Sequence, residues 1–125
     1  MACILHWEEK GLLRMYAGDG VLKGDDIFDS TLMLQSDKRF ADIEYVINDF
    51  SNVVNYDVSQ EDSQLFAMVD AISSRTKPNL KIAIVVPDER AEALAHGYCE
   101  LMKSSIYFCR VFFEMDGARS WCNSF

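Results

Sequence analysis

Apolar residues change their spacing several times along the chain, and each change marks an expected element. Two short apolar-rich stretches, residues 4–8 and 12–17, are joined by a turn at residues 9–11 that contains a glycine. A link this short can join only antiparallel neighbours, so we predict a β-hairpin. The glycine-rich residues 18–24 lack the spacing of a phosphate-binding loop, and we interpret them as a turn or bulge that continues the second strand.

Three later stretches are also typical of strands. Residues 45–49 begin with three apolar residues and end on Asn48 and Asp49, and a loop rich in Asn, Ser and Asp follows them. Residues 81–86 are apolar without alternation, which is typical of a central strand covered on both faces. Residues 106–113 are heavily aromatic and form the last expected strand.

Between these strands the apolar spacing lengthens to three and four residues, which indicates amphipathic helices. We predict helices over residues 25–35, 59–74, 88–102 and 116–122. Acidic or hydroxyl residues stand at their starts: the expected N-caps are Asp25 or Asp26, Ser59 and Asp116, and Pro87-Asp88 opens the third helix. The residues expected to face the core are Ile27, Phe28, Leu32 and Leu34; Leu65, Met68, Val69 and Ile72; Ala91, Leu94, Ala95, Tyr98 and Leu101 or Met102; and Ala118, Trp121 and Cys122.

The predicted element order is ββαβαβαβα. Helices between successive strands enforce right-handed crossovers, so the order predicts an α/β fold with a mainly parallel five-stranded sheet. The first strand is its antiparallel edge strand. No linker, repeat or low-complexity tract divides the sequence, and we predict one domain over residues 1–125.

Composition narrows the classes of function. Half of the residues are apolar and 26% are charged, which is typical of a folded globular protein. The formal net charge of −8 argues against nucleic acid and anionic membranes as partners. No apolar run is long enough for membrane insertion, and the N-terminus lacks a signal-peptide pattern, so we expect a cytoplasmic protein.

The four cysteines give no sign of a metal or redox site. Cys3, Cys99, Cys109 and Cys122 are widely scattered, and no Cys-x-x-Cys pair occurs. Structural metal sites and redox motifs need closely spaced thiols. We therefore expect four reduced thiols, no metal and no cofactor.

Two segments and the element order resemble one known superfamily. Residues 49–53, Asp-Phe-Ser-Asn-Val, are similar to an Asp-Leu-Ser-x-Val segment, and residues 111–121 are similar to a closing strand and a helix that ends on a tryptophan. With the leading hairpin, these features resemble the SpoIIAA-like superfamily, which includes anti-sigma factor antagonists, STAS domains and STAS/SEC14-type proteins. The resemblance implies a non-enzymatic bacterial regulatory or binding domain that acts through a protein partner or a small apolar or lipid-like ligand.

The resemblance also singles out Ser59. A phosphorylated Asp-Ser-Ser-Gly segment of the antagonists falls on residues 57–60, where two of the four residues match and Ser59 takes the acceptor place. Alternatively, Ser59 is only the N-cap of the helix, because a serine with an acidic residue three positions later is a helix-capping signal. A phospho-switched anti-sigma factor antagonist is thus the alternative function. The expected ligand or partner surface comprises Asp49, Ser51, Asn52, Asp57 and Ser59.

A third reading comes from carboxylates near strand ends. Asp49 and Asp57, with Asn48 and Asp88 nearby, could bind a divalent cation if their loops converge, which would suit a metal-dependent hydrolase. No nucleophile with a paired base is visible, and these residue types also cap helices and close turns. We therefore predict no catalytic residues.

Aromatic residues crowd the last expected strand. Tyr107, Phe108, Phe112 and Phe113 lie there, and Trp7 lies on the first strand. Core packing is the ordinary explanation for such rings. A sheet face left uncovered by helices would instead favour an apolar pocket or self-association, so we expect a homodimer.

Overall fold

The structure is a computed structural model that describes residues 1–124; Phe125, the last residue of the predicted domain, lies outside them. A short 3-10 helix over Lys38–Asp42 follows the first α-helix. The strands are β1 (Ala2–Trp7), β2 (Gly11–Ala17), β3 (Val21–Lys23), β4 (Tyr45–Asp49), β5 (Asn55–Asp57), β6 (Lys81–Val85) and β7 (Phe108–Phe112), and the helices are α1 (Gly24–Ser36), α2 (Gln60–Ser73), α3 (Glu89–Met102) and α4 (Met115–Cys122).

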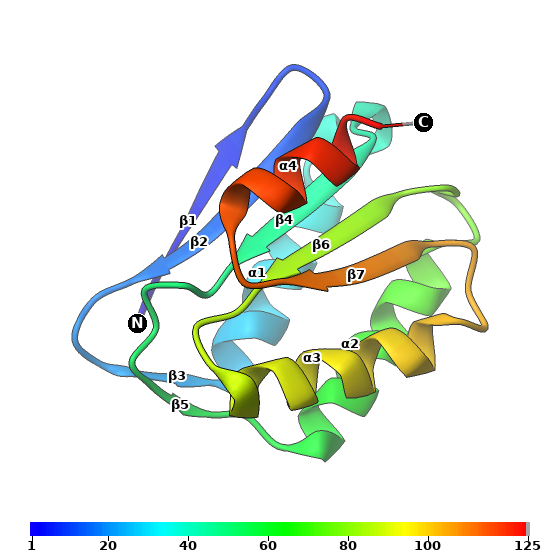
Figure 1. The fold of residues 1–125 in the computed structure, drawn as a ribbon. Helices are drawn as coiled ribbons and strands as arrows, with labels where there is room; N and C mark the ends of the chain where they lie inside the picture. The colour runs from blue at the N-terminus through cyan, green and yellow to red at the C-terminus, as the bar shows by residue number, and fades with distance from the viewer. Residues whose placement is uncertain (125) are drawn as a thin grey trace.

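The main sheet has five strands in the order β1-β2-β4-β6-β7 (Figure 1). β1 pairs with β2 in antiparallel fashion and stands at the edge, and every other neighbouring pair is parallel. The predicted α/β class, the five strands and the antiparallel N-terminal edge strand are confirmed. The strand register places Arg14, Asn48, Ile84 and Val111 in one row across the sheet.

The two faces of the sheet are covered unequally. α1, α2 and α3 pack on the face that carries Leu12, Val46 and Ile82, where most of the buried apolar residues gather. The opposite face carries Ile47 and Ala83 and is covered by α4, which packs against β4, β6 and β7 and runs alongside β4 in Figure 1. This asymmetry places the larger interior volume between the sheet and the first three helices.

β3 and β5 form a second, two-stranded parallel sheet that the sequence did not predict. We expected a turn or bulge at residues 18–24 and a loop after residue 49. Each of the two strands has three residues, which is too short for an alternating pattern to be recognisable. The small sheet lies beside the N-termini of α1 and α3 in Figure 1.

Two predicted N-caps are wrong by two or three residues. α1 begins at Gly24 with Lys23 as N-cap, so neither Asp25 nor Asp26 is the cap, although Asp26 accepts a 2.9 Å hydrogen bond from the Lys23 N–H. α4 begins at Met115 with Glu114 as N-cap, and Asp116 lies in its first turn. Acidic residues are favourable throughout a first turn, so composition alone does not fix which position caps the helix.

The predicted buried face of α2 is wrong at three of its four residues. Leu65, Met68 and Ile72 were expected to face the core but are 38%, 55% and 56% exposed, whereas Val69 is partly buried. The helix instead turns Phe66 and smaller or polar residues inward, namely Ser63, Ala67 and the partly buried Asp70. Leu32 of α1 and Leu101 of α3 are also exposed, whereas Ala95, Tyr98 and Met102 of α3 are buried as predicted.

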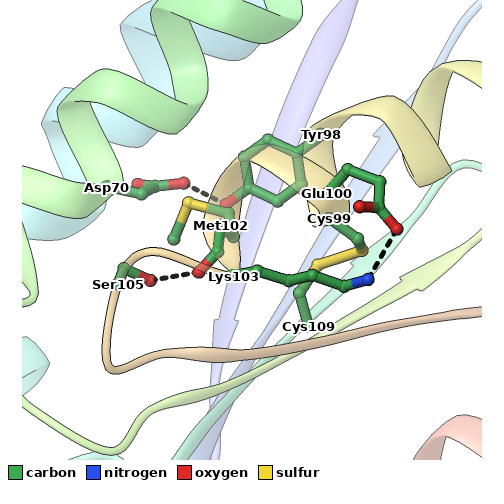
Figure 2. The surroundings of a disulfide bond; sticks show 8 residues. All are labelled: Asp70, Tyr98, Cys99, Glu100, Met102, Lys103, Ser105 and Cys109. Carbon is green, nitrogen blue, oxygen red and sulfur yellow. Dashed lines mark hydrogen bonds and ion pairs between the residues drawn. A yellow bond between two sulfur atoms is a disulfide. The ribbon is translucent and has the colours of Figure 1, made fainter.

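The expectation of four reduced thiols is corrected by a disulfide between Cys99 and Cys109, whose Cα atoms are 5.4 Å apart. Figure 2 shows Cys99 on α3 reaching Cys109 on β7, next to Tyr98, which points toward Asp70. Cys3 and Cys122 are free. The bond joins a helix to a strand, a contact that cysteine spacing alone does not reveal.

A polar contact ties the N-terminal hairpin to the C-terminal helix. Arg119 of α4 donates two hydrogen bonds, of 3.0 and 2.8 Å, to the carboxylate of Glu8, and the Tyr45 hydroxyl donates a third at 2.6 Å. The Arg119 hydrogen bonds lower the pKa of Glu8. Within residues 1–124, no helix has the length and apolarity needed to cross a membrane.

Candidate functional site

A cavity of about 100 Å³ lies between the sheet and helices α1, α2 and α3, and we call it the central cavity. The sheet contributes Arg14, Asn48 and Ile84, which are adjacent in the strand register. Side chains from the three helices and from the segment after β4 enclose it. Its apolar wall includes Ile27, Phe50, Val53, Phe66, Ile84 and Val86.

Arg14 and Asn48 form the polar end of the central cavity. Their side chains are 7% and 5% exposed, and Arg14 Nε donates a 2.7 Å hydrogen bond to Asn48 Oδ1. Arg14 Nη1 donates to the hydroxyls of Ser30 and Thr31 on α1, at 3.0 and 2.8 Å. All three acceptors are uncharged, so the buried guanidinium has no anionic partner in these contacts.

Asp70 of α2 is the other charged side chain that lines this cavity. Its carboxylate accepts a 2.8 Å hydrogen bond from Gln35 of α1 and a shorter one from the Tyr98 hydroxyl. Burial raises the pKa of Asp70, while the Tyr98 hydrogen bond and the positive charge of Arg14 act in the opposite direction. The charge of Arg14 acts on Asp70 at a distance, since no salt bridge joins the two side chains within residues 1–124.

Two strong donors at the polar end have no hydrogen-bond partner among residues 1–124. They are Arg14 Nη2 and Asn48 Nδ2. In the same residues, every fully enclosed side-chain nitrogen or oxygen has a partner. These two donors therefore retain accessible surface, and both residues line the central cavity and a smaller cavity of about 20 Å³ beside it.

An open groove between α2 and α3, with a volume of about 460 Å³, adjoins the central cavity. We call it the α2–α3 groove; Ser59, Gln60, Gln64, Arg90 and Gly97 are among its lining residues. Val58, Ser63 and Leu94 line both the groove and the cavity. These three side chains therefore lie where the groove meets the cavity.

Ser59 is the N-cap of α2. Its hydroxyl accepts a 3.1 Å hydrogen bond from the Asp62 N–H, and the Asp62 carboxylate accepts a 2.9 Å bond from the Ser59 N–H. The predicted capping role is confirmed, and the role as phospho-acceptor stays a prediction. Ser59 is exposed and lines the α2–α3 groove, but it does not line the central cavity.

The other predicted site residues lie outside the central cavity. Asp49 is the neighbour of Asn48 in β4 and points to the opposite face of the sheet, where its carboxylate accepts hydrogen bonds from the backbone N–H and the hydroxyl of Ser51, at 2.9 and 2.6 Å. Asn52 is exposed in the turn after β4, and Asp57 is exposed at the end of β5. The structure therefore does not gather the five predicted residues into one pocket.

The geometry offers no clustered metal ligands. Within residues 1–124, no group of three or more His, Cys, Asp or Glu side chains is placed to hold a metal ion. Asp88, which could have joined such a cluster, caps α3 by accepting a 2.8 Å hydrogen bond from the Ala91 N–H. This bond is the main cause of the lowered pKa of Asp88.

The segment over residues 45–62, which contains the five predicted site residues, is nevertheless next to the central cavity. Its residues Asn48, Phe50, Val53 and Val58 line the cavity, whereas its exposed polar residues do not. Arg14 was the missed residue. A single arginine between the apolar Leu13 and Met15 of a predicted strand was the one sequence signal that could have identified it.

No family model, no curated protein and no solved structure matches this chain. The α/β fold and its five-stranded mixed sheet rest on the structure itself.

Proposed function

We propose that this chain is a non-enzymatic binding domain that holds a small ligand with an apolar body in the central cavity. The observation that carries the proposal is the combination of an apolar wall with one buried polar end, formed by Arg14 and Asn48. Small-molecule sites are concave, mostly apolar and oriented by a few polar groups. The SpoIIAA-like resemblance favours the same class, a regulatory or ligand-binding domain.

The cavity volume limits the ligand. A cavity of about 150 Å³ in another protein accommodates benzene, so about 100 Å³ suits a smaller body, such as a branched chain of four carbons. Each buried CH₂ contributes about 0.8 kcal/mol, which gives about 3 kcal/mol for such a chain. About 3 kcal/mol corresponds to a dissociation constant of roughly 6 mM before the cost of association, so we expect weak binding, with a dissociation constant of roughly 10 mM or more, for a ligand of this kind.

A second candidate function is docking of a protein partner on α2. Leu65, Met68 and Ile72 form an exposed apolar stripe along this helix, at spacings that place them on one side. Exposed apolar stripes of this kind are common at protein interfaces. In a regulatory domain, α2 would connect ligand binding with partner docking, because its outer face carries the apolar stripe and its inner face carries Asp70, which lines the central cavity.

Phosphorylation of Ser59 remains the alternative form of regulation. A phosphate on Ser59 would have to displace the Asp62 carboxylate from the Ser59 N–H and would lie beside Glu61. Repulsion between these charges opposes the modification, while the helix N-terminus favours it. A cytoplasmic location and a homodimer stay part of the proposal on sequence grounds.

Titration with isoamyl alcohol, followed by methyl NMR, tests ligand binding. The alcohol has a branched apolar body and no charge. We expect saturable shifts of the Ile27, Ile84 and Val86 methyl signals, because these groups line the central cavity, and no shift of Ile106, which is 51% exposed elsewhere. Equal, non-saturating shifts at all of these methyl groups would contradict the proposal.

A further inference from the structure

The inference concerns the chemical class of the ligand, and it rests on the proposed function. We propose that the ligand is a short, branched or cyclic monocarboxylate, whose carboxylate accepts hydrogen bonds from Arg14 Nη2 and Asn48 Nδ2 while its apolar body fills the central cavity. The two residues come from adjacent strands and their side chains are joined by the 2.7 Å bond from Arg14 Nε to Asn48 Oδ1.

The first argument is charge. A guanidinium is protonated at every accessible pH, and an arginine buried in a protein is normally paired with an anion. Arg14 is 7% exposed, yet its contacts go to an amide oxygen and two hydroxyls. Asp70 lines the same cavity but forms no salt bridge with Arg14, so no anion is in direct contact with the guanidinium. A buried charge without such contact is costly, which favours binding of an anion beside Arg14 over binding of a neutral group.

The second argument is the set of free donors. Arg14 Nη2 and Asn48 Nδ2 donate to no residue from 1 to 124, although both residues are more than nine-tenths buried. Both residues line the central cavity, and the bond from Arg14 Nε to Asn48 Oδ1 holds their side chains together at its polar end, so we assign both free donors to that end. A carboxylate offers two acceptor oxygens, which matches two donors, and arginine recognises it with favourable planar geometry.

The third argument separates a carboxylate from a phosphate. The cavity lining supplies one cation, Arg14, and one acidic group, Asp70, which the Gln35 and Tyr98 hydrogen bonds hold in place. A phosphate dianion would bring about twice the negative charge of a monocarboxylate next to Asp70, so the monocarboxylate is the favoured anion. Two free donors would also leave most phosphate oxygens without partners.

The volume sets the size of the apolar body. About 100 Å³ limits the body to a few carbon atoms, and the wall residues Ile84, Val86 and Phe66 offer no further donors to it. A long fatty acyl chain exceeds this space and would have to extend into the α2–α3 groove. The ligand class is therefore a short carboxylate rather than a membrane lipid.

The test compares isovalerate with isovaleramide, which share one carbon skeleton and differ in charge. Isothermal titration at neutral pH measures both affinities for the wild-type protein, for Arg14→Gln and for Arg75→Gln. Arg75 is exposed after α2 and serves as the matched control. We expect the wild-type protein and Arg75→Gln to prefer isovalerate by tenfold or more, and Arg14→Gln to bind both compounds with affinities within threefold of each other.

A second measurement uses only the wild-type protein and so does not depend on how well Arg14→Gln folds. The Nε–H resonance of Arg14 should shift on saturation with isovalerate and stay in place with isovaleramide at equal occupancy. Equal shifts with both compounds would overturn the assignment of the carboxylate to Arg14.

The outcomes distinguish this inference from the proposed function. If isovaleramide binds as tightly as isovalerate, the carboxylate class is wrong and the cavity remains a binding site for neutral ligands. If Arg14→Gln keeps the preference for isovalerate, Arg14 is not the anchoring residue. If neither compound nor isoamyl alcohol perturbs the methyl groups of the cavity, both the ligand class and the proposed function are overturned.

Discussion

Arg14 of β2 and Asn48 of β4 are register partners in the parallel sheet, and their side chains are joined by a 2.7 Å hydrogen bond from Nε to Oδ1. The pair lies in the middle of a row whose other members include Leu5, Ile84 and Val111. A polar pair at the centre of an apolar sheet face costs stability unless its groups are satisfied. Arg14 Nη2 and Asn48 Nδ2 have no hydrogen-bond partner among residues 1–124, so the pair indicates a role beyond packing. It forms the polar end of the central cavity.

Replacing Asn48 with leucine should destabilise the fold. The change removes the acceptor of the Arg14 Nε–H and leaves that donor buried beside an apolar group, which costs about 1.5–3 kcal/mol. Urea unfolding measures the loss. Asn52→Leu, at an exposed position of the same segment, is the control and should change the free energy of unfolding by less than about 0.5 kcal/mol. Equal effects of the two changes would contradict the buried pair.

Asp70 should make stability depend on pH. Burial raises its pKa in the folded state, so the folded protein binds more protons than the unfolded chain above roughly pH 4. The wild-type protein should therefore lose stability relative to Asp70→Asn as the pH rises from about 4 through the folded-state pKa. Below that window the asparagine variant has no such advantage, because Asp70 is protonated in both states.

Unfolding free energies from urea titrations across this pH range provide the measurement for Asp70. Asp19→Asn, in the exposed turn after β2, corrects for the general effect of removing one carboxylate. A difference between the wild-type protein and Asp70→Asn that stays constant with pH would show that Asp70 is not perturbed by burial.

The sequence was most informative where the signal is local. Ser59 was correctly predicted as a cap because the signal lies within four consecutive residues, and the strands of the main sheet were recognised from short apolar runs. The partnership of Arg14 with Asn48 was not predictable in this way. It depends on strand register, which a single sequence leaves undetermined for strands without a shared turn.

The rotation of α2 has a similar physical origin. Leu65, Met68 and Ile72 form the more apolar stripe, so periodicity alone turns them inward. The structure turns Ser63, Phe66 and Asp70 inward instead. Asp70 has partners there in Gln35 and Tyr98, which come from other helices and are invisible to a pattern read within α2.

The disulfide between Cys99 and Cys109 should stabilise the protein. It closes a loop with a sequence separation of 10 residues, which predicts about 2–3 kcal/mol from restriction of the unfolded chain. A Cys99→Ala/Cys109→Ala double variant should lose that amount, and a reductant should destabilise the wild-type protein but not the double variant. Cys3→Ala is the control, since Cys3 is free.

Thiol titration under denaturing conditions checks the same bond directly. Without reductant, only Cys3 and Cys122 should react, and all four cysteines should react after reduction. Four reactive thiols without reductant would contradict the bond. Since disulfides seldom persist in the reducing cytoplasm, the state of Cys99 and Cys109 in cells also tests the expected location.

The central claim is that a ligand occupies the cavity between the sheet and α1–α3. Ala91→Leu tests it most directly, because Ala91 lines the central cavity and the added isopropyl group would take up much of its volume. Ala41→Leu places the same group at an exposed position of the 3-10 helix, away from the cavity and the α2–α3 groove. We predict that Ala91→Leu weakens the binding of isoamyl alcohol at least tenfold, while Ala41→Leu changes it less than twofold. Equal affinities for the two folded variants would contradict binding in the central cavity.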